Sequence, residues 1–489
     1  MKTLNTEQLL ELNIRLSTER DSDSLLRSIL DVAMDLTGCD GGTLYLLEEG
    51  ALRFYLMVTR SQGIDKGGHG EIVDLPPVPL QRENVCAWSA LEKKTVNIAD
   101  VYHTDLPFDL TGPRRYDAMT GYHTQSMLVL PMTNDREEVI GVLQLINAIG
   151  DDGAVAAFPE ESNRIIYALT CQAATRLTNL RYSREITDLL QSFVQVMSTA
   201  IDARTPYNAN HTRNMAFYAA NFLDWLRAAG DPHAMDDDAA REFLMSVWLH
   251  DVGKLVIPLE VMDKPTRLGA MEPGIAARWR AMRLLVSLRA AKGELTPEAA
   301  AAERSALDEG EALIRQVNGA GFLPDELLAG VAALGERTYA DEDGVLRPWL
   351  EPAEVTALSV RKGTLTAEER QTMESHVTMT ARLLSQMEFR HEYRNVPVWA
   401  GDHHEYLNGT GYPNRKTAAE LPFQVRLLTI LDIFDALTAK DRPYKKGMPP
   451  EKAVCILESM VKDGQLDGEI LALFRESRAW ETAGEKKTT

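Results

Sequence analysis

The chain has 489 residues, 45% of them apolar and 25% charged, a composition typical of a soluble globular protein with two or three domains. Its formal charge of −20 argues against general affinity for nucleic-acid polymers or for an anionic membrane. No apolar run approaches the roughly 20 residues that a membrane span needs, and the first residues lack the pattern of a signal peptide. We therefore expect a cytoplasmic protein.

The amino-terminal part alternates between helical and strand-like patterns. We expect a short helix over residues 1–20 and a second helix that begins after residues 21–24, whose small polar side chains can cap it. Apolar strands are predicted at residues 43–47 and 52–58. The Gly/Pro-rich residues 61–80 are predicted to form a loop.

Two further strands and a long helix follow. Residues 126–132 and 139–147 are apolar, and the polar turn between them is typical of a hairpin. From about residue 160 to residue 201, apolar positions recur every three or four residues without Gly or Pro. This stripe predicts a linker helix over residues 166–200 that pairs with a second copy, with a helix buried inside one subunit as the alternative.

The chain after residue 200 is almost entirely helical in pattern. Residues 267–360 are rich in Ala, Glu, Arg and Leu, contain no His, and interrupt two segments that carry His and Asp. We therefore expect a helical insertion at 267–360. The predicted architecture is an α/β domain with an antiparallel sheet over residues 21–165, the linker helix, and an all-α domain over residues 201–489.

The four cysteines, Cys39, Cys86, Cys171 and Cys455, lie far apart in apolar surroundings, and none forms a CxxC pair. This spacing predicts buried free thiols and not disulfides or a cysteine-ligated metal site. Free thiols agree with a reducing compartment.

Seven of the ten histidines lie after residue 200, and the first notable pair is His250-Asp251. This pair ends an apolar helix and is followed by Gly253 and Lys254. Neighbouring side chains on a helix point about 100° apart, so His250 and Asp251 can reach two metals from one turn. The Asp251 carboxylate has two oxygens that can bridge the metals, and Lys254 can supply a point charge for a phosphate.

Other segments also carry histidines and aspartates that could bind a metal. His376 lies in a helical pattern, His403 and His404 precede a Gly-rich turn, and Asp432 and Asp435 lie in an apolar helix. Carboxylates in such a helix are costly unless they are bound or paired. Each feature alone has a packing explanation, such as a hydrogen-bonded core histidine or an internal cap. Together they supply imidazoles and carboxylates suited to Fe, Mn or Zn, with enough ligands for two ions.

At these residues the chain resembles the HD-GYP domain, a branch of the HD phosphohydrolases. The matching segments are residues 250–254, His376, 403–405, 409–413, 432–438 and 442–444, and residues 202–211 resemble the start of the domain. The resemblance covers about residues 200–265 and 362–450. It implies hydrolysis of cyclic di-GMP to linear pGpG, and in some members on to GMP, by a hydroxide that bridges two metals.

The resemblance also implies a set of metal ligands. They are His250, Asp251, His376, His403, His404 and Asp432, with Asp251 as the bridging residue. Two divalent ions are expected, Fe or Mn, and a third if Asp202 and His211 also bind. Asp202 stands where many members have Glu, which puts the third ion in doubt because its side chain is one methylene shorter.

The remaining site residues follow from the same resemblance. Asp251 and Lys254 would act in catalysis, and Lys254 and Arg442 would contact the substrate phosphates, although the segment before Arg442 is one residue longer than is common. Tyr412 either contacts the substrate or only closes the Gly-Pro turn. Glu405 and Asp435 would orient the histidine ligands from behind.

Residues 22–180 resemble a GAF domain on the segments 84–90, 95–100, 126–132 and 139–147. GAF domains that bind cyclic nucleotides often carry an Asn-Lys, Phe and Asp-Glu signature. Asn147 and Phe158 fit this signature, whereas Ala148 and residues 162–163 depart from it. Ligand binding and pure dimerisation therefore both stay open, and the GAF ligand is unknown.

The leading interpretation is a cyclic di-GMP phosphodiesterase that is regulated by its GAF domain and is a homodimer through that domain and the linker helix. One alternative is the same reaction on 3′,3′-cyclic GMP-AMP. Another is a non-catalytic scaffold that binds nucleotide or a diguanylate cyclase partner. Asp202 and the insertion favour the scaffold slightly, whereas the near-complete set of metal ligands argues against it.

Overall fold

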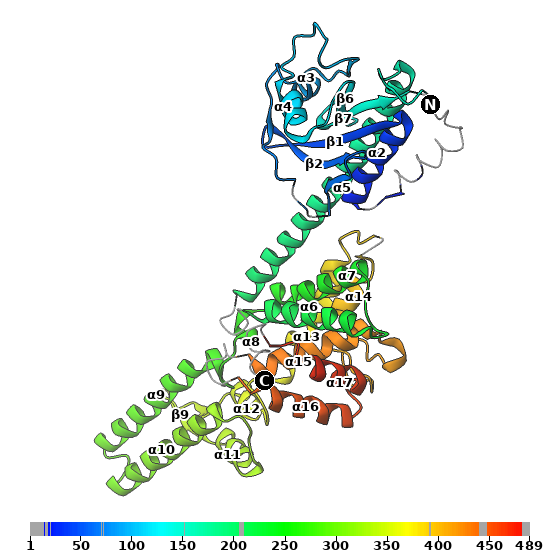
Figure 1. Cartoon of the computed structure of the whole chain (residues 1–489). Helices are drawn as coiled ribbons and strands as arrows, with labels where there is room; N and C mark the ends of the chain where they lie inside the picture. The colour runs from blue at the N-terminus through cyan, green and yellow to red at the C-terminus, as the bar shows by residue number, and fades with distance from the viewer. Residues whose placement is uncertain are drawn as a thin grey trace. The chain divides into compact units, whose positions relative to one another are not determined.

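The computed structural model describes residues 14, 18–19, 21–69, 71, 73–150, 152–204, 210–390, 393–439 and 447–481. The chain divides into two compact units, Met1–Leu189 and Leu190–Thr489 (Figure 1). Helix α5 (Glu160–Asp202) covers the boundary between them, close to the range expected for the linker helix. The helix expected over residues 1–20 falls almost wholly outside the described residues.

The first unit is built on an antiparallel sheet whose main path runs β3-β2-β1-β7-β6-β5. The strands are β1 (Cys39–Glu48), β2 (Ala51–Thr59), β3 (Ile64–Gly67), β4 (Val78–Pro79), β5 (Val96–Ile98), β6 (Met127–Thr133), β7 (Val139–Ile149) and β8 (Val155–Ala156). The predicted hairpin is β6–β7, with Leu130 opposite Leu143. The prediction of a loop over residues 61–80 was wrong in part, because β3 and β4 both pair with β2 there.

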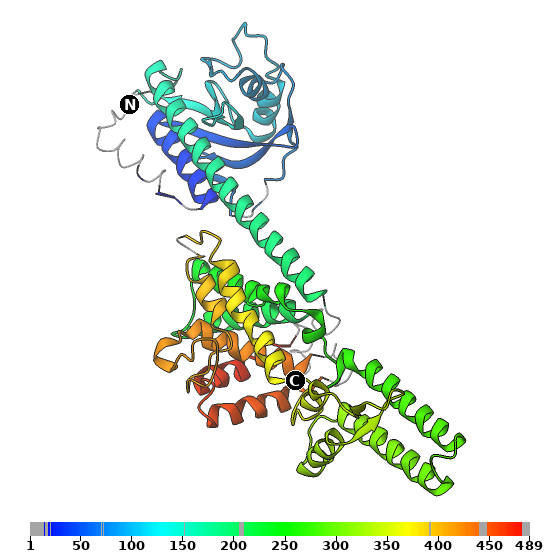
Figure 2. The ribbon, with the colours of Figure 1, turned by 180° about the vertical axis from the view of Figure 1, so that it is seen from behind.

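Helices cover both faces of this sheet. They are α2 (Ser22–Thr37), α3 (Val85–Glu92), α4 (Thr111–Thr120) and the first part of α5. The helices α2 and α5 lie across one face, where Leu30 and Ile166 share a core with Leu44 (Figure 2). On the other face, Val85 of α3 packs in a core with Val142. The Asp21 side chain accepts a hydrogen bond from the Ser24 backbone at 2.8 Å, which is the cap expected for α2.

The second unit is helical and has a hydrophobic core of its own. Its elements are α6 (His211–Ala229), α7 (Asp237–Leu249), η1 (Val252–Val256), α8 (Leu259–Met262), α13 (Ala367–Leu384), α14 (Val396–Gly401), η4 (Ala418–Glu420), α15 (Phe423–Thr438), α16 (Pro450–Lys462) and α17 (Gly468–Ser477). Phe222, Phe243, Phe434 and Phe474 join α6, α7, α15 and α17 in one hydrophobic cluster, which α16 completes. No helix in the described ranges is long and apolar enough to cross a membrane.

The insertion forms a subdomain with a core of its own. Its elements are η2 (Gly269–Met271), α9 (Glu272–Ala291), α10 (Pro297–Gly319), α11 (Asp325–Gly335), β9 (Thr338–Ala340), β10 (Leu346–Pro348) and α12 (Pro352–Leu358). Trp279 and Trp349 meet edge to face, with ring centroids 5.6 Å apart, inside this core. The insertion is mainly helical, as expected, and it also contains a short hairpin formed by β9 and β10. Asp341 closes its turn by accepting the Val345 N–H at 2.8 Å.

The cysteines are free, as expected, but they are not all buried. Cys39 and Cys86 are buried, Cys171 is half-buried and Cys455 is exposed. Cys455 lies on α16, whose buried side is formed by Ala453, Val454 and Leu457. Burial of Cys455 was therefore a wrong prediction, because that position of the helix points to solvent.

Candidate metal centre

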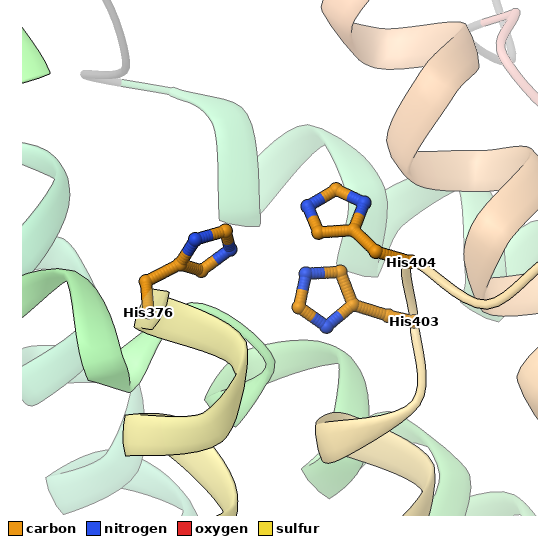
Figure 3. Close-up of side chains that lie close together, drawn as sticks. All are labelled: His376, His403 and His404. Carbon is orange, nitrogen blue, oxygen red and sulfur yellow. The ribbon is translucent and has the colours of Figure 1, made fainter. Parts of the chain in front are cut away.

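Five separate segments of the second unit bring imidazoles and carboxylates into one cluster. His211 begins α6, His250-Asp251 follow α7, His376 lies in α13, His403-His404 follow α14, and Asp432 lies in α15. The ligand atoms form three overlapping groups, within each of which they lie within 4.8 Å of one another. The groups are His376, His403 and His404; His211, His250 and Asp432; and His250, Asp251 and His403. Figure 3 shows the ring of His376 facing those of His403 and His404.

Backbone carbonyls fix the orientation of three of these rings. In each, Nδ1 donates to the carbonyl three residues earlier: His250 to Val247 at 2.8 Å, His376 to Met373 at 2.6 Å, and His403 to Ala400 at 2.7 Å. With the proton on Nδ1, the lone pair of Nε2 is free to face the cluster. This arrangement selects the tautomer that a metal ion requires.

Three buried atoms of the cluster lack a hydrogen-bond partner among the described residues. They are Asp251 Oδ1, His376 Nε2 and His403 Nε2. Buried polar atoms are normally paired, so three such atoms in one cluster need an explanation. All three are atoms of a type that can bind iron, manganese or zinc. The residues therefore fit a bound divalent metal.

Asp251 occupies the centre of the cluster. Its Oδ2 lies 2.6 Å from Lys254 Nζ and 3.1 Å from His250 Nε2, and its Oδ1 lies 3.5 Å from His376 Nε2. Burial opposes ionisation of Asp251, but the neighbouring His250 imidazole and Lys254 ammonium outweigh burial and hold its pKa well below the usual range. Burial likewise opposes the charged form of Lys254, yet Asp251 raises its pKa. The pair is therefore ionised, with Asp251 as an anion.

Burial keeps the facing histidines neutral. It lowers the pKa of His403 well below 6.5 and lowers the pKa of His404 to about 4. The pKa of His376 is also lowered, again chiefly by burial. Metal ions bind the neutral imidazole, so these rings are ready to act as ligands at neutral pH without losing a proton.

His211 differs from these three histidines because its pKa is raised and not lowered. Its Nδ1 lies 2.7 Å from Asp435 Oδ2, and its Nε2 lies 3.3 Å from both Asp432 Oδ1 and His250 Nε2. Burial lowers its pKa, but the hydrogen bonds to Asp432 and Asp435 outweigh burial and raise it to about 10. His211 is therefore a cation here, and a metal ion bound at Nε2 would take the place of that proton.

Asp202 lies beside the cluster but outside the three groups of ligand atoms. Its carboxylate accepts the backbone N–H and the hydroxyl of Thr212, each at 3.2 Å. Burial raises its pKa. The carboxylate thus caps the first turn of α6, next to His211.

The loop after His404 differs from the expectation for Glu405. The Glu405 carboxylate accepts the backbone N–H groups of Asn414 at 2.6 Å and Lys416 at 2.9 Å, so it closes the loop and does not contact a histidine ring. Tyr412 packs its ring against His404, with centroids 4.8 Å apart. Arg442, expected at the substrate phosphates, lies outside the described residues.

Two threonines that the sequence reasoning missed hold the ligand segments together. Thr380 donates to the His250 carbonyl at 2.9 Å and accepts the Gly253 N–H at 2.9 Å. Thr429 donates to the His403 carbonyl at 2.9 Å. Thr380 stands one helical turn after His376, and that spacing is the one signal in the sequence that points to it.

Family models match two separate parts of the chain. Residues 21–177 match the GAF domain, and residues 350–470 match the HD domain. The HD match contains His376, His403, His404 and Asp432. A crystallised GAF domain from an Acinetobacter phosphoenolpyruvate-protein phosphotransferase covers 38% of this chain and 99% of that chain, at 16% identity and a TM-score of 0.28.

Characterised relatives share shorter stretches. The 3′3′-cGAMP-specific phosphodiesterase 3 of Vibrio cholerae is 33% identical over 121 residues, which are 25% of each chain. The cyclic di-GMP phosphodiesterase of Thermotoga maritima is 34% identical over 107 residues, 21% of this chain and 27% of that protein. The chain thus spans about a quarter of the length of the curated relatives it matches. By the family matches, this chain carries an amino-terminal GAF domain and a carboxy-terminal HD domain.

Proposed function

We propose that the second unit is a metal-dependent phosphodiesterase that hydrolyses cyclic di-GMP to linear pGpG, and then in part to GMP. The observation that carries this proposal is the buried set of partnerless ligand atoms on Asp251, His376 and His403. The relatives with HD-type similarity are named as phosphodiesterases of cyclic dinucleotides, which supports the same reaction class.

We assign two divalent ions, Fe or Mn, to this cluster. The proposed ligands are His250, Asp251, His376, His403, His404 and Asp432. Asp251 is the proposed bridging residue because its two oxygens face different histidines, Oδ2 toward His250 and Oδ1 toward His376. His211 and Asp202 are the candidates for a third ion. When bound, such ions neutralise phosphate oxygens and lower the pKa of water at the site.

The protein's own groups would bind and orient the substrate. Lys254 Nζ is held 2.6 Å from Asp251, and its side chain keeps 18% of its surface exposed, so it can meet a phosphate oxygen at the edge of the cluster. A fixed ammonium there stabilises charge that develops on the phosphate. Asp435 would keep His211 in place, and Asn214 steadies Asp435 from the other side at 3.1 Å. Tyr412 and Arg442 remain proposed substrate contacts.

The direct test is turnover by the purified full chain after loading with Fe(II) or Mn(II) under anaerobic conditions. We expect cyclic di-GMP to be converted to pGpG, and the His250→Ala plus Asp251→Ala double variant to lose both metal and turnover. A folded, metal-loaded protein that leaves every cyclic dinucleotide intact would refute the proposal. A protein that binds nucleotide or a diguanylate cyclase but no metal would instead support the scaffold alternative.

A second candidate substrate is 3′,3′-cyclic GMP-AMP. Two of the relatives, the 3′3′-cGAMP-specific phosphodiesterases 3 and 1 of Vibrio cholerae, are named for it, at 33% and 34% identity. Turnover of the two dinucleotides at matched concentrations decides between them, since the preferred substrate has the higher kcat/KM.

We further propose that the GAF domain regulates this activity and that the chain is a homodimer through this domain and α5. The side chain of Asn147, which fits the nucleotide-binding signature, is already engaged, since it accepts the Gln125 N–H at 2.7 Å and donates to the His123 carbonyl at 2.8 Å. This engagement favours a structural role for Asn147.

A further inference from the structure

The end of α5 holds the segment that carries His250, Asp251 and Lys254. Ser198 donates its hydroxyl to the Trp248 carbonyl at 2.7 Å, just before this segment. Arg204, two residues beyond α5, donates Nη1 to the Lys254 carbonyl at 2.6 Å and Nη2 to the Ile257 carbonyl at 3.3 Å. Ser198 and Arg204, which lie six positions apart, therefore donate hydrogen bonds to the two ends of this segment.

A second element holds the same segment through different atoms. Thr380 of α13 bonds the His250 carbonyl and the Gly253 N–H, each at 2.9 Å. Gly253 fits so closely against α13 that a Cβ there would lie 1.9 Å from the His376 carbonyl oxygen. The segment thus lies against α13 at His250 and Gly253, whereas at Lys254 the side-chain support comes from Arg204.

An arginine side chain can donate to both of these carbonyls at once. A guanidinium presents several N–H donors in a rigid plane, so it can bridge two carbonyls that an ammonium would contact singly. The Lys254 carbonyl also accepts the Ile257 N–H at 3.2 Å, and Arg204 therefore closes the turn of η1 from outside. Fixing the Lys254 backbone fixes the point from which its side chain reaches Asp251, 2.6 Å from Nζ.

We propose that Arg204 is a positioning residue that sets the place of Lys254 by clamping the carbonyls of Lys254 and Ile257. This inference rests on the proposed function, in which Lys254 meets the substrate phosphate. Among the described residues, no hydrogen bond or ion pair joins Arg204 to the ligand atoms or to Lys254 Nζ, so its effect on the reaction is indirect. A displacement of about 1 Å in a reacting group can lower the rate about 100-fold.

The test compares Arg204→Ala and Arg204→Lys with Arg280→Ala, an exposed arginine of α9 with no ion pair among the described residues. Two readouts do not depend on turnover. Hydrogen exchange of residues 252–257 reports the clamp, and trace acetylation of Lys254 followed by mass spectrometry reports the Lys254–Asp251 pair. Metal content and the steady-state constants complete the comparison.

Arg204→Ala should speed exchange in residues 252–257 and raise Lys254 acetylation several-fold, while exchange in α15 and the metal content stay unchanged. We expect its kcat to fall about 10- to 100-fold, with a smaller change in KM. Arg204→Lys should recover part of each effect because it can hold one carbonyl, and Arg280→Ala should match the wild type.

Unchanged exchange and acetylation in Arg204→Ala would overturn the clamp, whatever the turnover. Faster exchange with wild-type acetylation and kcat would overturn the positioning role. A wild type that is loaded with metal but inactive refutes the proposed function and not the clamp, because exchange and acetylation still decide whether Arg204 places Lys254.

Discussion

Asp251 lies close to nitrogen atoms of three side chains, those of Lys254, His250 and His376. Its exposed fraction is 4%. Without a negative charge at this position, the half-buried ammonium of Lys254 would lose its nearest carboxylate, which is costly. The proposed metal binding and the local charge balance therefore depend on the same carboxylate.

Asp251→Asn tests this dependence, because the amide keeps the shape and removes the charge. We expect the variant to lose most of its metal and at least about 100-fold of its turnover, since even residues behind a metal ligand contribute 10- to 100-fold. Elemental analysis and turnover are the measurements. Asp224→Asn, on the exposed side of α6, is the matched control. Full metal content in Asp251→Asn would exclude Asp251 as a ligand.

The thiols give a pH-dependent prediction away from this cluster. Burial raises the pKa of Cys39 to about 11 and that of Cys86 to about 12. Alkylation needs the thiolate, which these groups form only as the pH rises toward those values. At pH 8, iodoacetamide should modify the exposed Cys455 well before Cys39 or Cys86, and urea should remove the difference. Peptide mass spectrometry measures the order, and equal rates in the native protein would contradict it.

The candidate ligands could be predicted from sequence because they occur as local signals, such as the adjacent pairs His250-Asp251 and His403-His404. The contacts that hold these ligands in place could not be predicted from sequence. Thr380 bonds to Gly253 across 127 positions of the chain, and nothing near either residue marks the other. Glu405 is expected to orient a histidine ligand, whereas its carboxylate accepts the backbone N–H groups of Asn414 and Lys416, 9 and 11 residues later in the chain.

Among the elements, long helices and long strands were predictable and short strands were not. The stripe of α5 and the apolar runs of β6 and β7 extend over enough residues to display their period. The strands β9 and β10 have three residues each, which is too few to show alternation inside a helical region. The turn at Asp341–Gly344 was the available signal, since Asp and Gly are typical of hairpin turns.

The insertion should be removable as an element. Its hydrophobic core is separate from the core that supports the cluster. Its ends adjoin, because Arg267 donates Nε to the Val360 carbonyl at 2.7 Å. The ion pair of Lys264 Nζ with Glu369, at 2.7 Å, lies outside it and would remain.

Replacement of residues 267–360 by a short Gly/Ser linker should therefore leave the metal content unchanged, and closing so short a loop costs little. Circular dichroism and elemental analysis of the shortened chain, beside the full chain, are the measurements. Retained helicity with lost metal would mean that the insertion supports the cluster, and turnover that rises or falls in a metal-loaded variant would give it a role in substrate access.

At the scale of the whole molecule, α5 presents a row of apolar side chains to water in a single copy, and this row is called the seam below. Ile186, Leu189, Phe193 and Val196 are 66%, 72%, 60% and 67% exposed. Their spacing of three, four and three residues is that of the a and d positions of a coiled coil. Val194, on another side of the helix, is buried in a cluster with Met245 and Leu249, so this part of α5 packs on its own unit and still presents the seam to water.

Burying a large apolar side chain contributes about 1.5–3 kcal/mol, so four such residues from each of two copies can drive pairing of the helices. We expect the full chain to be a dimer at micromolar concentration and the Leu189→Glu plus Phe193→Glu variant to be a monomer, by sedimentation velocity. Gln195→Glu adds a charge at an exposed position outside the seam and should stay dimeric. A monomeric wild type, or a double variant that remains dimeric, would show that the seam does not mediate dimerisation. Because both substituted positions are exposed in a single copy, unchanged metal content in the monomer would separate loss of pairing from loss of fold.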